Sequence, residues 1–465
     1  MSSQSVEMAF AQPTAGIGEV RIKPQQYHME PGEQHLLTVG DGPGLGAVAW
    51  ELDAQNLPAI WNGWQPDPQS TESTTVFRTE PRPGLEATMT YHLTRPELNG
   101  LAVTLSIINH TAHPQAIQPR LLGGQYLSDP LDHGRYQLLR ASVGGKVRTW
   151  HTRLGGQPQR VAGSVAWVAA QTKYYTTIFE SKTTSSALVV TYDAKGHPWA
   201  WLEWPAAELA PGAVQTWELR GYAGPLDYRY LDELQLDQAA SLGAFTVISR
   251  LLRAAMHTIA GAVHSYGVAI VTLTVSLSAL FAPLTLMSFR TMKKMQVLQP
   301  EIQQLQERHK KDPKKLNEEL MKAYKKHQVN PMAGCLPLLF QMPVFIALYQ
   351  VLSRSPELRG AKFLLIQDLS APDAIIKLPS VLPVVGSAIN VLPLAMAVMM
   401  FVQQRFSTQK AVTEEQRIQQ QVFTFMPLLF GVMFYSLPSA LVLYWLLNTT
   451  LAVVQQAMVA RKFSA

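Results

Sequence analysis

The sequence predicts an α+β membrane protein in which an N-terminal antiparallel β-sandwich precedes a bundle of five transmembrane helices. Charge is distributed unevenly: residues 1–245 contain 17 Lys and Arg against 23 Asp and Glu, whereas residues 246–465 contain 22 against 10. Nine of the ten tryptophans lie before residue 220. This asymmetry indicates two domains in different solvents. The single cysteine, Cys335, excludes an internal disulfide and a zinc site built from several cysteines.

Short alternating runs predict strands over residues 18–235, after a tail over residues 1–17. Ala87–Leu93 and Leu101–Ile107 alternate apolar and polar residues, and Asn99-Gly100 between them is a favourable hairpin turn. Further short runs are separated by Gly, Pro, Asp and Asn, so we expect a large antiparallel sandwich. Its aromatic residues could form the core or a platform for carbohydrate, and we favour the core: Trp199, Trp201 and Trp204.

No motif in the sandwich indicates catalysis. Metal-ligand spacing, a nucleophile elbow and a phosphate-binding loop are all missing from the sequence, and the histidines are scattered singly. We therefore expect no catalytic residues, no metal ion and no cofactor.

Residues 236–266 predict an amphipathic helix. Apolar residues recur at three- and four-residue spacing, while Arg250, Arg253 and His257 occupy other positions. The apolar residues are Phe245, Ile248, Leu251, Leu252, Ala255 and Ile259. A basic helix with a large apolar face can lie in the membrane interface. The alternative is a linker helix packed on the sandwich.

Residues 267–465 predict the transmembrane core. Five apolar segments fit: 267–287, 332–352, 385–402, 422–437 and 441–458. A bilayer core of about 30 Å needs about 20 mostly apolar residues, so the third and fourth segments are short.

A basic helical hairpin over residues 289–328 separates the first two segments. The loops on its side of the predicted bundle carry 16 Lys and Arg, whereas the opposite loop, residues 354–377, carries four. The positive-inside rule therefore places the hairpin in the cytoplasm and the β domain outside it. The hairpin is either a solvated face or a contact for anionic lipid or ribosomal RNA, through Lys310, Lys311, Lys314 and Lys315.

Polar residues recur within the predicted spans. Thr274, Ser278 and Thr285 fall near one face of the first span, and Gln341 and Asn448 could join them. Such a stripe lines a wet groove or joins helices by hydrogen bonds. No Asp, Glu, Lys or Arg lies in the middle of a span, which argues against an ion-coupled transporter, because coupling usually needs an ionisable residue there.

Several motifs occur in the order of a known family, and by them the chain resembles the YidC/Oxa/Alb membrane protein insertases, in the Gram-negative YidC form with a large periplasmic domain. These motifs are Met295-x-x-Leu-Gln-Pro300, Val329-Asn-Pro331, Gly334-Cys-Leu-Pro337, Gln341-Met-Pro343, Ala347-Leu-Tyr349, Asn390-Val-Leu-Pro393, Phe425-Met-Pro427, Leu441-Val-Leu-Tyr-Trp445, Asn448 and Gln455-Gln456. Residues 167–175 also look like a motif of the family's periplasmic domain.

The resemblance implies a periplasmic β-supersandwich similar to sugar mutarotases and a multi-pass protein of the bacterial inner membrane. It implies insertion and folding of nascent membrane proteins, alone or beside the Sec translocon, through a polar groove open to cytoplasm and lipid. Ribosome, targeting receptor and anionic lipids are implied partners, and DNA is not. The family's substrate contacts, carried over to this chain, imply that the substrate slides along Leu338, Leu339, Tyr444 and Trp445. The alternative interpretation of these four residues is ordinary bundle packing or exposure to lipid.

Three departures from the family pattern stand out. Ser278 aligns with the family's intramembrane arginine, and we expect its hydroxyl to bond back to the carbonyl of Thr274. The chain begins Met1-Ser-Ser-Gln without the usual first apolar span, so either the start is truncated or about 240 residues cross the membrane as an N-terminal tail. The long basic C-terminal tail of some relatives is absent. The rival interpretation is a membrane-anchored carbohydrate-binding β domain.

Overall fold

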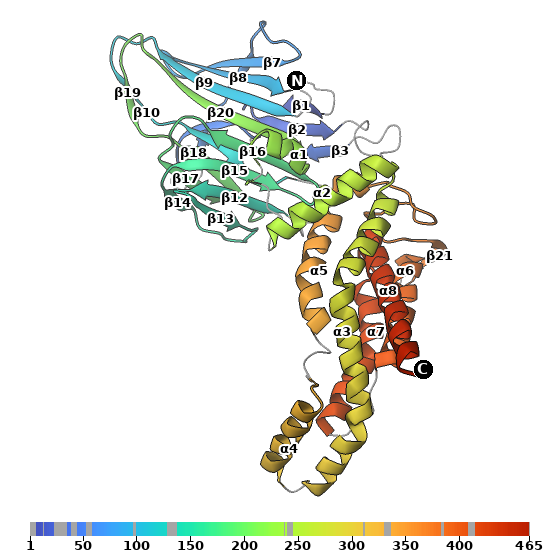
Figure 1. The fold of residues 1–465 in the computed structure, drawn as a ribbon. Coiled ribbons are helices and arrows are strands. Elements are labelled where there is room, and N and C mark those ends of the chain that lie inside the picture. The colour runs from blue at the N-terminus through green and yellow to red at the C-terminus, as the bar shows by residue number, and fades with distance from the viewer. Residues whose placement is uncertain are drawn as a thin grey trace. The chain divides into compact units, whose positions relative to one another are not determined.

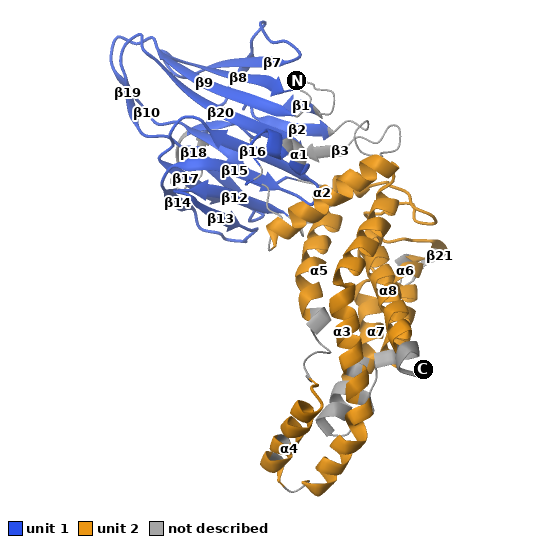
Figure 2. Cartoon of the chain, viewed as in Figure 1, with its two compact units in different colours: residues 1–241 blue, residues 242–465 orange. Residues whose placement is uncertain are grey.

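The chain forms two compact units, residues 1–241 and 242–465 (Figure 2). The computed structural model describes residues 6–12, 14–22, 35–38, 44–52, 58–95, 99–127, 137–236, 238–239, 245–309, 312–329, 336–382, 386–407 and 414–464.

The first unit is an antiparallel β-sandwich with two main sheets (Figure 1). The nine-stranded sheet has the order β13 (Lys146–Trp150), β12 (Leu138–Val143), β15 (Val165–Gln171), β16 (Tyr175–Ser181), β20 (Val214–Pro225), β9 (Gly100–Asn109), β8 (Leu85–Arg95), β7 (Thr74–Arg82) and β6 (Gln65–Pro66). The six-stranded sheet has the order β14 (Gln159–Ala162), β17 (Ala187–Tyr192), β18 (Pro198–Glu203), β11 (Arg120–Gly124), β4 (Val48–Leu52) and β5 (Pro58–Ile60).

Smaller elements complete this unit. A three-stranded sheet contains β1 (Val6–Phe10), β2 (Ile17–Ile22) and β3 (His35–Thr38), and β10 (Gln115–Ile117) pairs with β19 (Ala207–Leu209). A short helix, α1 (Tyr228–Glu233), follows the last strand. Strand β1 lies within residues 1–17, where the sequence predicts a tail; Met8 is buried there, and its strand pairs with β2.

The core of the sandwich follows from alternation along the strands. On β8, Leu85, Ala87, Met89 and Tyr91 are buried, and the residues that alternate with them are more exposed. This strand pairs with β9, and Asn99 before β9 adopts a positive φ of 57°. Gly100, predicted as part of the turn, is instead the first residue of β9 and pairs with Arg95. Both the predicted hairpin and the predicted sandwich are confirmed. Trp201 and Trp204 are 0% exposed, so they belong to the core rather than to a carbohydrate platform.

The second unit is helical. Its elements are α2 (Thr246–Val263), α3 (Tyr266–Arg308), α4 (Pro313–Lys326), α5 (Leu336–Arg354), the 3₁₀ helix η4 (Pro356–Leu358), the hairpin β21 (Ile376–Leu382) and β22 (Gly386–Ile389), α6 (Val391–Ser407), α7 (Glu414–Met433) and α8 (Ser439–Ser464). Helix α2 packs against α3 and α5, since Leu252, Met256 and Ala260 share one core with residues of both helices.

Helix α3 runs without a break through the predicted first span and the first limb of the hairpin, across Pro283 and Pro300. Ser265 caps its start by accepting from the backbone N–H of Val268. Asp312 caps α4 in the same way, accepting from the N–H of Lys315 at 3.1 Å, and Pro313 occupies the first turn.

Two of the described helices are long and apolar enough to cross a membrane by length and composition, over Tyr266–Met295 and Ser439–Val459. Shorter apolar stretches occur over Val391–Arg405 and Thr424–Met433. The predicted third span does not begin at residue 385, because β21 and β22 pair across residues 376–389. The count of five spans stays a prediction.

Candidate functional site

Two polar contacts join α8 to neighbouring helices inside the second unit. The Ser278 hydroxyl on α3 donates to Oδ1 of Asn448 at 3.3 Å. The Gln341 side-chain amide on α5 donates to the hydroxyl of Tyr444. The sequence predicts that Ser278, Gln341 and Asn448 share a polar face, and the structure places each of them in a contact between helices. Ser278 bonds across to α8 instead of back to the carbonyl of Thr274.

Two threonine hydroxyls of the same face donate to backbone carbonyls within α3 itself. Thr274 is 1% exposed, and its hydroxyl donates to the carbonyl of Ile270 at 2.6 Å. Thr285 donates likewise to Phe281 at 3.0 Å. A hydroxyl bonded to the preceding turn adds no cross-link between helices. Fewer residues therefore form polar contacts between helices than the predicted stripe contains.

Aromatic side chains lie beside these contacts. Trp445 packs edge-to-face on Phe345, with ring centroids 4.7 Å apart, and stacks on Phe430 at 5.7 Å. Phe434 lies 5.4 Å from the same indole. Such pairs add roughly 0.5–1.5 kcal/mol beyond the area they bury. They hold α8 against α5 and α7 where the polar contacts sit.

The four predicted slide residues differ in exposure. Tyr444 is buried, Trp445 is half-buried, and Leu339 is 66% exposed. The side chain of Leu338 lies outside the described residues. An exposed leucine near the start of α5 and a buried tyrosine on α8 are thus in different environments.

The site is chemically neutral. Asn448 accepts through its carbonyl oxygen, which leaves its NH₂ group to donate to an incoming polar group. Hydrogen bonds between membrane helices average about 0.6 kcal/mol, so these contacts can exchange for others at small cost.

The basic hairpin is tied together at its base. Glu301 on α3 accepts from His327 Nε2 at 2.9 Å, and Lys326 Nζ lies 3.6 Å from the same carboxylate. Lys314 and Lys315 are exposed on α4. Lys310 and Lys311 lie outside the described residues.

A buried ionic cluster was not predicted from the sequence. On α2, Arg253 donates to Glu357 of η4 at 2.9 Å, and His257 Nε2 lies 3.3 Å from the same carboxylate. Glu357 is 5% exposed. Burial by itself would raise the pKa of Glu357, but the charge of Arg253 and the hydrogen bond from His257 outweigh it and hold the pKa below its usual value.

A signal for this cluster exists in the sequence. Arg253 and His257 are four residues apart, so they lie on one face of α2. The predicted faces of this helix are wrong at two positions: Arg253 lies on the buried side with Leu252 and Met256, whereas Leu251, expected on the apolar face, is exposed. A buried arginine requires a carboxylate, but its partner is 104 residues away, in a loop.

Comparisons with known proteins match both units of the chain to the same type of protein. Residues 258–465 match the family described as 60Kd inner membrane protein, and residues 52–254 match the YidC periplasmic domain. The chain is 39% identical over 263 residues to the membrane protein insertase YidC of Cupriavidus pinatubonensis, covering 56% of this chain and 44% of that protein. It is 36% identical over 304 residues to the one of Cupriavidus necator, covering 64% and 52%. The chain thus spans about half the length of these curated relatives.

Two solved structures are also similar. A crystal structure of an active YidC insertase with its first transmembrane domain resolved covers 98% of this chain and 90% of its own, with 15% identity and a TM-score of 0.39. A galactose mutarotase related enzyme from Lactobacillus acidophilus covers 48% and 96%, with 11% identity and a TM-score of 0.35. Both TM-scores are low.

Proposed function

Because the chain belongs to the YidC type of the YidC/Oxa/Alb insertase family, we propose that it inserts and folds membrane proteins in the bacterial inner membrane. The observation that carries this proposal is a pair of uncharged hydrogen bonds within apolar surroundings. One joins α3 to α8 and the other joins α5 to α8. The activity needs neither covalent chemistry nor a cofactor.

The physical task is to lower the barrier for moving a hydrophilic segment through hydrocarbon. Each polar backbone group that loses water there costs several kcal/mol unless a partner replaces the water. Ser278, Gln341 and Asn448, with Thr274 beside them, offer such partners in a groove open to the cytoplasm and the lipid. Short spans add to this by thinning the bilayer locally.

The apolar residues have the complementary role. Leu338, Leu339, Tyr444 and Trp445 form the path along which a new helix passes from the groove to lipid. Two observations support this path. Tyr444 is hydrogen-bonded to Gln341, as expected at the groove end, and Leu339 is exposed, as expected at the lipid end.

The remaining assignments follow from charge and from the family. Five spans, a cytoplasmic hairpin and a periplasmic β domain agree with the 16-to-4 distribution of Lys and Arg. The hairpin contacts anionic lipid, the ribosome or a targeting receptor, and the Sec translocon is a second partner.

The test is complementation in cells depleted of their own insertase, with protease protection of a single-span substrate as the readout. Asn448→Leu removes the acceptor for Ser278 and should lower insertion severalfold. Ser276→Ala is the control on α3, the helix that carries Ser278, since the Ser276 side chain is exposed and its hydroxyl donates to the carbonyl of Thr272 within that helix. Wild-type insertion by Asn448→Leu rejects the groove, and failure of the unmodified chain rejects the function.

A further inference from the structure

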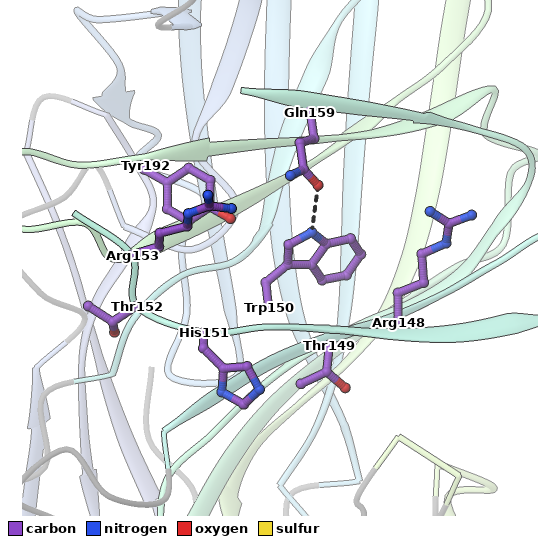
Figure 3. Close-up of a pocket in the computed structure, with 8 residues that line it drawn as sticks. All are labelled: Arg148, Thr149, Trp150, His151, Thr152, Arg153, Gln159 and Tyr192. Carbon is purple, nitrogen blue, oxygen red and sulfur yellow. Dashed lines mark hydrogen bonds between the residues drawn. The ribbon is translucent and has the colours of Figure 1, made fainter. Parts of the chain in front are cut away.

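A pocket lies in the β-sandwich unit, where the edges of its two main sheets come together. Its lining comes from β13, from the loop that follows it, from β14 and from β17, and encloses about 670 Å³. The Trp150 indole N–H of β13 donates to Gln159 Oε1 of β14 at 3.3 Å and bridges the two edges (Figure 3). This volume is within the roughly 300–1,000 Å³ typical of ligand pockets.

The pocket is basic and has no acidic lining residue. Its charged residues are Arg148 and Arg153, with His151 beside them. Several other arginines of the sandwich pair with carboxylates, as Arg120 and Arg160 do with Glu203. Within the described part of the chain, neither Arg148 nor Arg153 has such a partner. The acid closest in sequence to Tyr192, Asp193, already accepts from His197 at 2.9 Å.

The loop that carries Arg153 is held in place by close backbone contacts. A side chain at Gly196 would come within 2.6 Å of the backbone of Arg153, and Gly196 has a positive φ of 80°. The N–H of Arg153 donates to the carbonyl of Gly196 at 2.7 Å. A Cβ at Gly156 would lie 2.7 Å from the Tyr192 ring. Arg153 and Tyr192 are therefore positioned by fixed backbone rather than by a free loop.

One side of β13 is open. In the described structure this strand pairs with β12 alone, and it forms the edge of the nine-stranded sheet. Arg148 and Trp150 point to one side of the strand, and Thr149 and His151 point to the other (Figure 3). An exposed edge offers backbone N–H and C=O groups to an extended peptide.

From these observations we propose that the pocket binds an acidic, extended polypeptide segment, which adds to the open edge of β13. Arg148 and Arg153 pair with its carboxylates, and Tyr192 contacts its apolar side chains. Arginine suits this role because its planar fork binds carboxylates through two hydrogen bonds. The site is independent of the proposed insertase function, since it uses only residues of the first unit.

The test measures fluorescence anisotropy of labelled peptides with the full chain in detergent. An octapeptide of alternating Glu and Val is the probe, and the alternating Gln and Val peptide is its neutral match. Arg148→Gln with Arg153→Gln should weaken binding of the acidic probe about tenfold, which corresponds to about 1.4 kcal/mol. Arg82→Gln with Arg95→Gln removes the same charge near the opposite edge of the sheet and should leave binding unchanged.

Two further arms separate the proposal from its rivals. Replacing both pocket arginines by lysine should keep part of the binding, and methylating alternate backbone nitrogens of the probe should weaken it. Equal losses in both glutamine pairs, or equal binding of the neutral peptide, would overturn the proposal and leave the charges as protection of an open edge. Binding of dextran sulfate through the same arginines, with no effect of methylation, would reject a peptide ligand in favour of any polyanion.

Discussion

Replacing Ser278 by arginine tests how a neutral groove works, because the family resemblance places an arginine at this position. Ser278 lies near the middle of the apolar stretch Tyr266–Met295, where its hydroxyl donates to Asn448. We expect the unmodified chain to insert a substrate with a neutral periplasmic tail. Arginine should mainly improve a substrate with an acidic tail, because a cation attracts it.

The structure sets the magnitudes. The Ser278–Asn448 distance of 3.3 Å is long for an O–H···O bond, so Ser278→Ala should cost no more than about 0.6 kcal/mol. Arginine at the centre of a span costs about 2.5–3.5 kcal/mol on insertion scales. A bond from its guanidinium to Asn448 would offset about 1.5–3 kcal/mol of that cost. The arginine variant should therefore accumulate in the membrane at near-normal levels.

The assay compares unmodified protein, Ser278→Ala and Ser278→Arg in a depletion strain, with protease protection of both substrates and immunoblots of each variant. Ser278→Ala should reduce insertion of the neutral substrate no more than about threefold, since a loss of about 0.6 kcal/mol in one contact corresponds to roughly that factor. The neutral-groove mechanism is refuted if the unmodified chain supports neither substrate and arginine restores both.

The other predictions concern three regions outside the groove. Cysteine labelling at Asn317 should be blocked in intact cells, while labelling at Asn99 should succeed once the outer membrane is permeable; the reverse pattern would rule out the proposed orientation. When the hairpin lysines Lys310, Lys311, Lys314 and Lys315 are changed to glutamine, binding to ribosomes or anionic lipid should weaken and become less salt-sensitive. Unchanged binding would show that this basic face is only solvated. Glu357→Gln should lower the free energy of unfolding by about 3–5 kcal/mol, because Arg253 stays buried without a counter-ion, whereas the joint change with Arg253→Met should cost less. Since the pKa of Glu357 is lowered from its usual 4.5, its contribution to stability should be present above about pH 4.5 and be lost as the pH falls below it; a Tm of the unmodified chain that is no more acid-sensitive than that of Glu357→Gln would contradict this.

The alternation of apolar and polar residues predicted the strands of the sandwich that pair with their neighbours in sequence. The alternation on either side of Asn99 gave both strands and their turn, because a hairpin needs only neighbouring residues. Strand β1 was not predicted, because five residues give little periodicity and its partner begins at Ile17. The hairpin of β21 and β22 was hidden for another reason: its apolar residues continue into α6 and resemble one longer span.

For the candidate site, the sequence identified residues better than partners. Helical spacing and polarity were enough to single out Ser278, Gln341 and Asn448. That Ser278 meets Asn448, 170 residues away, depends on how α3 and α8 pack, which spacing along one helix does not determine. The same holds for Tyr444, expected on an apolar path and found as the partner of Gln341.

The continuity of α3 has a mechanical consequence. At about 1.5 Å per residue, its 43 residues make a rod of roughly 65 Å, about twice the hydrocarbon thickness. Pro283 removes one backbone hydrogen bond five residues beyond Ser278, so bending is easiest there. A bend of about 20° at that point would swing Arg308 through roughly 13 Å. The helix is thus a lever whose short arm carries the Ser278–Asn448 contact and whose long arm ends at the hairpin turn, so a small strain at the contact is amplified into a large displacement at the tip.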